Sequence, residues 1–164
     1  SQYVQCAKLL SFPKKAEAIC SSLCEKIKKK FSNIDIILSP AIGGIVVGYE
    51  VGRQLSLETI FAERSEGQLI LRRGFKIPEN SNVLIVEDVI TTGKSALECS
   101  EIIKKCNSIV AGYACIIDRS DKNILIESEI ISQIKFQIKT YKKNLIIFKS
   151  EIILEITHIF SRKI

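Results

Sequence analysis

Two adjacent carboxylates, Glu87 and Asp88, directly follow the apolar run Val83–Val86. Carboxylates accept hydrogen bonds from the neighbouring hydroxyls of a ribose, whereas unsatisfied backbone amides at the start of a helix bind a phosphate. A hydroxyl-rich glycine turn that could bind a phosphate in this way comes next in the chain. It consists of Thr91, Thr92, Gly93, Lys94 and Ser95. Its glycine lets the backbone approach a ligand closely. The spacing therefore predicts a site for a phosphorylated sugar, with the diol and the anion held one sugar apart.

The same stretch has two other interpretations. Asp and Thr before a helix commonly cap it in a solvated turn, but two acids after four buried apolar residues are costly unless they face a cleft. The residues Gly93-Lys94-Ser95 also match the end of a Walker A loop. The leading glycine of that loop would fall at Asp88, whose charge repels phosphate, so this interpretation is rejected.

Helix-like and strand-like segments alternate around this stretch. Periodicity predicts helices over 12–31, 45–55 and 95–106, and strands over 34–38, 59–62, 83–86 and 109–117. Further extended pieces are expected over 68–75, as a hairpin or mobile loop, and over 134–141, as an edge strand, with a closing helix or strand over 145–160. The alternation predicts right-handed βαβ units in an α/β fold, an open, mostly parallel sheet flanked by helices. At 164 residues we expect one domain, 1–164.

Ligands in such sheets bind beyond the carboxyl ends of the strands. That rule selects three places, which are Pro40–Gly44, Glu87–Ser95 and Asp118-Arg119. Taken alone, the Gly43-Gly44 turn is better explained as a tight connection between a strand and a helix.

Composition excludes several classes of protein. The apolar fraction of 46% and the charged fraction of 26% are ordinary for a globular chain. The net charge of +6 is scattered except for Lys28–Lys30, and no basic and aromatic residues interleave along one face, so no nucleic-acid groove is expected. A modest positive field suits a small polyanionic substrate. Lys149, Glu151 and Glu155 interrupt the most apolar stretch, so no membrane span is expected.

The six cysteines form no CxxC pair, and the single His158 offers them no partner at metal-ligand spacing. Cys20 and Cys24 fall on one helix face, but two thiols make an incomplete metal site. Buried small apolar residues in a reducing cytoplasm are the expected explanation.

The order of hydrophobic strand, Glu-Asp, two residues and Thr-Thr-Gly resembles the signature of the phosphoribosyltransferases that use phosphoribosyl pyrophosphate (PRPP). The resemblance implies that Glu87 and Asp88 hold the ribose hydroxyls, with Asp88 in a catalytic role. It implies that the turn from Thr91 to Ser95 holds the 5-phosphate, the amide of Lys94 included.

Ser39-Pro40-Ala41-Ile42-Gly43-Gly44 resembles the pyrophosphate loop of the same family, which implies that Ala41, Ile42, Gly43 and Gly44 receive the leaving group. Some members carry Lys where Gly43 stands. The charge on pyrophosphate is therefore expected to be met by Mg²⁺ carried with PRPP, with no direct protein ligand, and by other cations.

Within that family the chain is most similar to the orotate phosphoribosyltransferases, through Tyr3–Ala7, Phe61–Arg64, Leu71–Phe75 and Ile117–Arg119. The resemblance implies the type I phosphoribosyltransferase fold. Relatives usually have a further segment ahead of Tyr3 that helps to form a hood over the base, so the hood is expected to be reduced or missing here.

The same resemblance assigns the base and the loop cations. Arg119 is expected to pair with the orotate carboxylate through two hydrogen bonds, and Thr91 also to touch orotate; an ion pair with Asp121 is the alternative for Arg119. The cations expected in a mobile loop shared between subunits are Arg64, Arg72, Arg73 and Lys76. Arg64 is the best placed and is expected to be catalytic, whereas a solvated hairpin explains Arg72 and Arg73 equally well. A shared loop implies a homodimer.

The expected reaction is orotate plus PRPP giving orotidine 5-monophosphate and pyrophosphate, a step of pyrimidine synthesis. Stabilising the leaving group and positioning the base carry the catalysis, and no covalent intermediate is expected because no activated nucleophile is apparent. Two alternatives remain open. A purine phosphoribosyltransferase shares the fold, although Arg119 argues against it, and a non-catalytic regulator that senses PRPP would lack a cationic loop.

Overall fold

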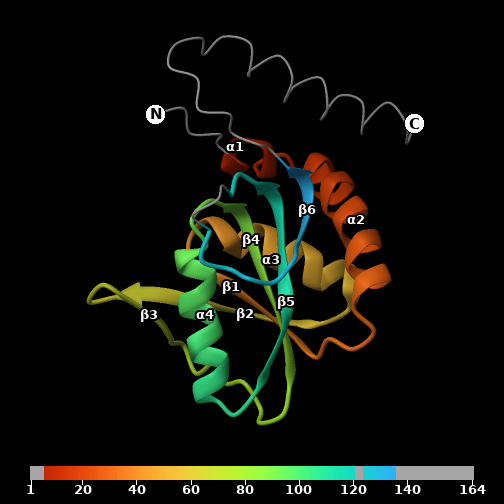
Figure 1. Ribbon diagram of the computed structural model, residues 1–164. Coiled ribbons are helices and arrows are strands. Elements are labelled where there is room, and N and C mark those ends of the chain that lie inside the picture. Colours follow the sequence, from red (N-terminus) through yellow and green to blue (C-terminus); the bar gives the residue numbers. More distant parts are fainter. Residues whose placement is uncertain (1–5, 121–123, 136–164) are drawn as a thin grey trace.

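The computed structural model describes residues 6–120 and 124–135 of the chain. Its elements, shown in Figure 1, are α1 (Cys6–Leu10), α2 (Pro13–Lys30), β1 (Ile36–Pro40), α3 (Gly43–Leu55), β2 (Glu58–Ser65), β3 (Gln68–Leu71), β4 (Asn82–Ile90), α4 (Lys94–Lys105), β5 (Ile109–Asp118) and β6 (Ile130–Lys135). The strands form one sheet in the order β3-β2-β1-β4-β5-β6. Only the β2–β3 pair is antiparallel, so the prediction of an open, mostly parallel sheet is confirmed.

Helices cover both faces of the sheet. One hydrophobic cluster packs α1, α2 and α3 against one face, and a second packs α4 against the other. The continuous apolar run in β4 is explained by this burial on both faces. Leu84 and Val86 face the first cluster, and Val83 and Ile85 face the second. Among the described helices, Figure 1 shows α4 in front of the sheet and α3 behind the strands.

Three glycines let α3 lie unusually close to the sheet. Gly44, Gly48 and Gly52 recur every four residues and are buried against the strands. A Cβ atom at Gly48 would overlap the hydroxyl of Ser39 in β1, and one at Gly52 would overlap Thr59 in β2. This close contact sets the start of α3 directly beside the carboxyl end of β1.

Gly48→Ala is therefore expected to destabilise the fold by about 1–3 kcal/mol, as overpacking does in a filled core. Urea unfolding followed by circular dichroism measures it. Ser39 supplies the control, because its buried hydroxyl has no hydrogen-bond partner within the described part of the chain. Ser39→Ala opens the space that the new methyl needs, so the double variant should recover most of the loss. A Gly48→Ala chain as stable as the native one contradicts the close packing.

Several predicted boundaries need correction. Strand β4 extends to Ile90, four residues beyond the predicted end, so Glu87 and Asp88 lie inside the strand rather than after it. Helix α1 was not predicted, because five residues are too few for a periodic pattern. The predicted edge strand is present as β6, which lies at the edge of the sheet beside β5 but covers Ile130–Lys135. The predicted remainder, 136–141, lies outside the described residues. The segment 145–160 also lies outside them.

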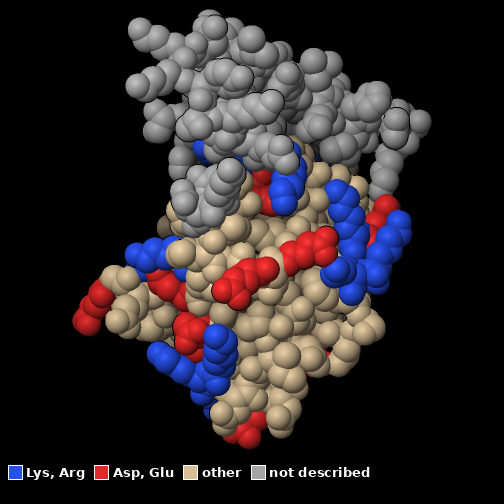
Figure 2. Space-filling view, viewed as in Figure 1, with Lys and Arg blue, Asp and Glu red and all other residues tan. Residues whose placement is uncertain are grey.

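None of the helices in the described residues combines the length and the apolar composition that a membrane span requires. The lysines of α2 that end the helix, Lys28–Lys30, are solvent-exposed as predicted. Figure 2 shows lysine and arginine side chains in separate groups on the visible face, with acidic side chains between them.

Candidate active site

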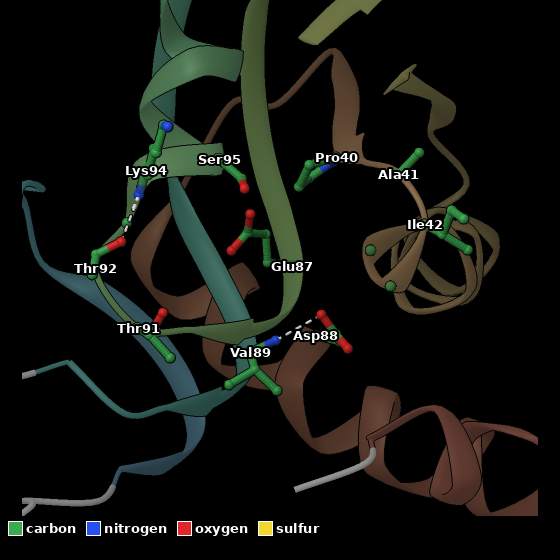
Figure 3. A pocket seen from close by; sticks show the side chains of 13 residues that line it. Pro40, Ala41, Ile42, Glu87, Asp88, Val89, Thr91, Thr92, Lys94 and Ser95 are labelled. Atoms are coloured by element: carbon green, nitrogen blue, oxygen red, sulfur yellow. Dashed lines mark hydrogen bonds between the residues drawn. The ribbon is translucent and has the colours of Figure 1, made fainter. Parts of the chain in front are cut away.

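A cavity of about 270 Å³ opens where β1 and β4 end and where α3 and α4 begin. Its lining comes from two stretches, Pro40–Gly44 and Glu87–Ser95, and Figure 3 shows them facing each other. Every residue predicted to bind PRPP lines this cavity, and Pro40 and Val89 line it as well. Two of the three strand ends selected from the sequence thus meet in one site.

The two acids point to opposite sides of β4. Successive side chains of a strand alternate between its faces, so Glu87 points toward Ser95 of α4 while Asp88 points toward the loop that precedes α3 (Figure 3). A Cβ atom at Gly43 would come within 2.7 Å of the Asp88 carboxylate, which shows how closely that loop approaches. The acids therefore face the two arms of the cavity separately, whereas the sequence had placed both on one side.

Burial sets the charge state of the acids. It raises the pKa of Glu87 to about 8, with a further contribution from the charge of Asp88. Burial also raises the pKa of Asp88, although the backbone amide of Val89 donates to its Oδ1 at 2.9 Å and opposes that rise. The unliganded cavity thus favours a neutral Glu87 beside a more exposed Asp88.

The turn before α4 has the geometry of an anion site. Gly93 adopts a left-handed conformation, with φ of 79°, at the N-cap of α4, where it has no side chain that could cap the helix. The amide of Lys94 donates only a long bond, 3.4 Å, to Oγ1 of Thr92. Among the residues that line the cavity, Lys94 is also the only cation. Free amides, a helix N-terminus and one lysine suit a phosphate monoester.

The second arm of the cavity is the loop that enters α3. The helix begins after Ile42, whose side chain cannot cap it, and the amide of Ile45 donates to the carbonyl of Ile42 at 3.2 Å. The amides of Gly43 and Gly44 at the start of the helix are therefore the ones that can reach a ligand. The Ala41–Ile42 peptide is cis. Amides ahead of a helix suit a second anion, which fits the predicted place of pyrophosphate.

The predicted loop cations lie outside this cavity. Arg64 forms an ion pair with Glu98 of α4 at 3.0 Å and donates to the carbonyl of Gly67 at 2.6 Å. Arg73 pairs with Glu63 through two bonds of 2.7 and 3.1 Å. The predicted hairpin is present as the antiparallel pair β2–β3. Arg72 and Lys76 follow β3 and are exposed. The structure therefore brings none of the four cations to the acids within this one chain.

Arg119 also lies outside the cavity lining. It follows β5, is half-buried, and donates its amide to the carbonyl of Ile90 at 2.8 Å. The neighbouring Asp118 is fully buried, and Lys135 of β6 lies 3.3 Å from its carboxylate. The alternative partner of Arg119, Asp121, lies outside the described residues.

All six cysteines are free thiols. Five of them are buried as predicted, whereas Cys106 is half-buried. Burial raises the pKa of Cys6 to about 12 and that of Cys24 to about 11, so both are poor nucleophiles. Across the described ranges, no group of three or more His, Cys, Asp or Glu side chains has the arrangement of a metal site.

Comparison with known proteins identifies the family. The model of the phosphoribosyl transferase domain matches residues 12–144. The orotate phosphoribosyltransferase of Chlorobaculum parvum is 45% identical over 141 residues, which cover 86% of this chain and 72% of the relative. That of a Thermoanaerobacter species is 43% identical over 141 residues, covering 86% of this chain and 73% of the relative.

Two solved structures share the fold at low identity. Adenine phosphoribosyltransferase from Thermoanaerobacter pseudethanolicus matches with a TM-score of 0.68 and 18% identity over 78% of this chain and 84% of that one. Orotate phosphoribosyltransferase from Aeropyrum pernix matches with a TM-score of 0.67 and 17% identity, over 81% and 78%. The fold, the two-armed cavity and the identity to relatives along most of their length agree, so this chain belongs to the phosphoribosyltransferases and, within them, to the orotate phosphoribosyltransferase family.

Proposed function

We propose that this chain transfers the 5-phosphoribosyl group of PRPP to orotate, giving orotidine 5-monophosphate and pyrophosphate in pyrimidine synthesis. The observation that carries the proposal is the single cavity in which two carboxylates lie between two open helix N-termini. PRPP has a matching layout, with a diol between a 5-phosphate and a pyrophosphate. Each of its three polar groups then meets the protein group that binds it best.

The roles follow from the direction of each side chain. Glu87 faces the turn at α4, so it accepts a ribose hydroxyl on the side of the 5-phosphate. Asp88 faces Gly43, so it accepts the other hydroxyl on the side of the pyrophosphate. The Thr91, Thr92 and Ser95 hydroxyls join the amides around the 5-phosphate.

Magnesium is proposed to arrive with PRPP, without a direct protein ligand. Lys94 is the only cation in the cavity lining, so the charge of pyrophosphate needs a further counter-ion. Mg²⁺ bound with PRPP would neutralise the oxygens of the leaving group. The protein then has to hold the sugar still while positive charge develops at the anomeric carbon, and its carboxylates favour that charge.

Remaining positive charge is proposed to come from Arg64, Arg72, Arg73 and Lys76 of a second subunit. Two of these, Arg64 and Arg73, are held by acids of their own chain and lie off the cavity. These cations lie away from the cavity of their own chain, so we propose that they reach the pyrophosphate in the active site of the other subunit.

An exposed apolar stripe next to the cavity supports the proposal of a homodimer. Three large apolar side chains occupy one exposed face of α3 and its entry loop, with Ile42 85%, Val46 49% and Tyr49 65% exposed. Their spacing of four and three residues places them in one stripe. A symmetric dimer buries such a stripe against its own copy. Because the stripe starts at the pyrophosphate arm, the homodimer brings the second subunit to the edge of the site.

Val46→Glu is expected to convert the dimer to a monomer, because it places two unpaired charges in a symmetric apolar contact. Sedimentation velocity over a range of concentrations measures the change. Ile109→Glu is the matched control, since Ile109 is 56% exposed but begins β5, away from the stripe. A Val46→Glu chain that still sediments as the native oligomer rules out this surface.

We also propose a cytoplasmic location. Its support is that all six thiols are free, which is the usual state in a reducing compartment.

The proposed function is tested by pyrophosphate release with PRPP and four bases offered in turn: orotate, uracil, adenine and hypoxanthine. We expect pyrophosphate release with orotate and with none of the other three bases. Release with a purine instead supports the purine alternative, and PRPP binding without release on any base supports the regulator.

A further inference from the structure

The stretch Ile124–Ile126 lies directly behind the phosphate turn. The amide of Leu125 donates to the carbonyl of Thr92 at 3.0 Å. A Cβ atom at Gly93 would lie 2.8 Å from Cγ1 and 2.9 Å from Cδ1 of Ile126, and 3.7 Å from Cγ1 of Ile124. Thr92 is thus held by a hydrogen bond and the next residue, Gly93, by an apolar contact.

This support is anchored in the hydrophobic core. Ile126 is 5% exposed and belongs to the cluster beneath α4, together with Ala96 and Cys99 of that helix. Ile124 packs against the same cluster. The position of Ile126 is therefore fixed by the same core that fixes the start of α4.

The turn has little internal support of its own. Thr91, Thr92 and Lys94 are exposed, and the bond from the Lys94 amide to Thr92 Oγ1 is long at 3.4 Å. A phosphate site works only if its amides converge on one point before the ligand arrives, since ordering them on binding weakens the affinity. The convergence must then be imposed from behind the turn.

We infer that Ile126 is a positioning residue for the 5-phosphate, with the Leu125 amide as its polar counterpart. The inference rests on the proposed function of the turn. Ile126 fills the space beneath Gly93, and shortening its side chain lets the turn relax away from the phosphate. The effect is confined to the phosphate arm, because the pyrophosphate arm comes from the other side of the cavity (Figure 3).

Ile126→Ala in the full chain tests this. Titration calorimetry with ribose 5-phosphate is expected to show an affinity about tenfold weaker, while inorganic pyrophosphate binds within about twofold of native. In the PRPP assay, KM for PRPP should rise more than kcat falls. Ile126→Val, one methyl group smaller, should give an affinity between those of the native and the alanine chains, and a fully native affinity in it counts against the inference if the alanine variant does not fold.

Ile103→Ala is the matched control. Ile103 is 0% exposed and lies in the same cluster, but near the far end of α4. It should lose stability and keep its affinity for ribose 5-phosphate. Native affinity in Ile126→Ala, or an equal loss in Ile103→Ala, overturns the inference. If the unaltered chain binds no ribose 5-phosphate, the proposed function fails instead.

Discussion

Asp88→Asn is expected to lower kcat/KM for PRPP by about 10²–10³, with the free energy of unfolding almost unchanged. Asparagine keeps the shape of the side chain, and its amide oxygen still accepts the bond from the Val89 amide that orients Asp88. It lacks the charge that favours the developing positive charge of the sugar and that strengthens the bond from a ribose hydroxyl. Chemistry is therefore lost while packing is retained.

Steady-state pyrophosphate release and urea unfolding measure the two effects on the same preparation. Asp118→Asn is the contrasting variant, because Asp118 is a buried carboxylate one strand away that faces Lys135 instead of the cavity. It should lose stability and keep most of its turnover, the opposite pattern. Unchanged turnover in Asp88→Asn refutes the role assigned to Asp88.

Local sequence was sufficient for the parts of the site that lie on one stretch of chain. The run Val83–Val86 reads as doubly buried because α3 and α4 cover opposite faces of β4. A parallel sheet then brings its strand ends to one edge, so Gly43-Gly44 and Glu87–Ser95 were expected to meet although they lie far apart in sequence.

Pairing between strands determines where β4 ends and which way Glu87 and Asp88 point, and local sequence does not encode this pairing. Polar residues usually signal the end of a strand, but β5 continues alongside β4, with Glu87 opposite Cys115 and Ile90 opposite Asp118. The ladder therefore keeps Glu87 and Asp88 in extended conformation and turns them to opposite faces. A prediction from propensity alone places them in a loop, where no such division arises.

Contacts between distant side chains were equally hidden. Arg64 was assigned to the mobile loop by its neighbours in sequence, yet its ion pair with Glu98 depends on how β2 lies against α4. The contact between Ile126 and Gly93 joins segments 33 residues apart and has no pattern of its own. Such contacts depend on the register of the whole sheet, which no short motif encodes.

The stability of the unliganded chain is expected to fall by about 2 kcal/mol as pH rises from 6 to 8, because of Glu87. The folded chain holds a proton on Glu87 up to a pKa of about 8, whereas the unfolded chain releases it near the ordinary value of 4.5. The folded state therefore binds more protons in this window, so raising the pH favours unfolding. Acids with lowered pKa values, such as Glu63, act in the opposite direction but only below this window.

Urea unfolding at pH 6, 7 and 8 measures the slope, which Glu87→Gln should remove by replacing the titrating carboxyl with a neutral amide. Glu63→Gln should leave the pH dependence of stability unchanged.

The affinity for PRPP is expected to depend on pH in the opposite direction, because a ribose hydroxyl donates to the ionised carboxylate of Glu87. PRPP affinity should rise from pH 6 to 8, with a proton released on binding. Calorimetry in two buffers of different ionisation enthalpy counts that proton. No proton release, together with flat stability, contradicts a protonated Glu87 before PRPP binds.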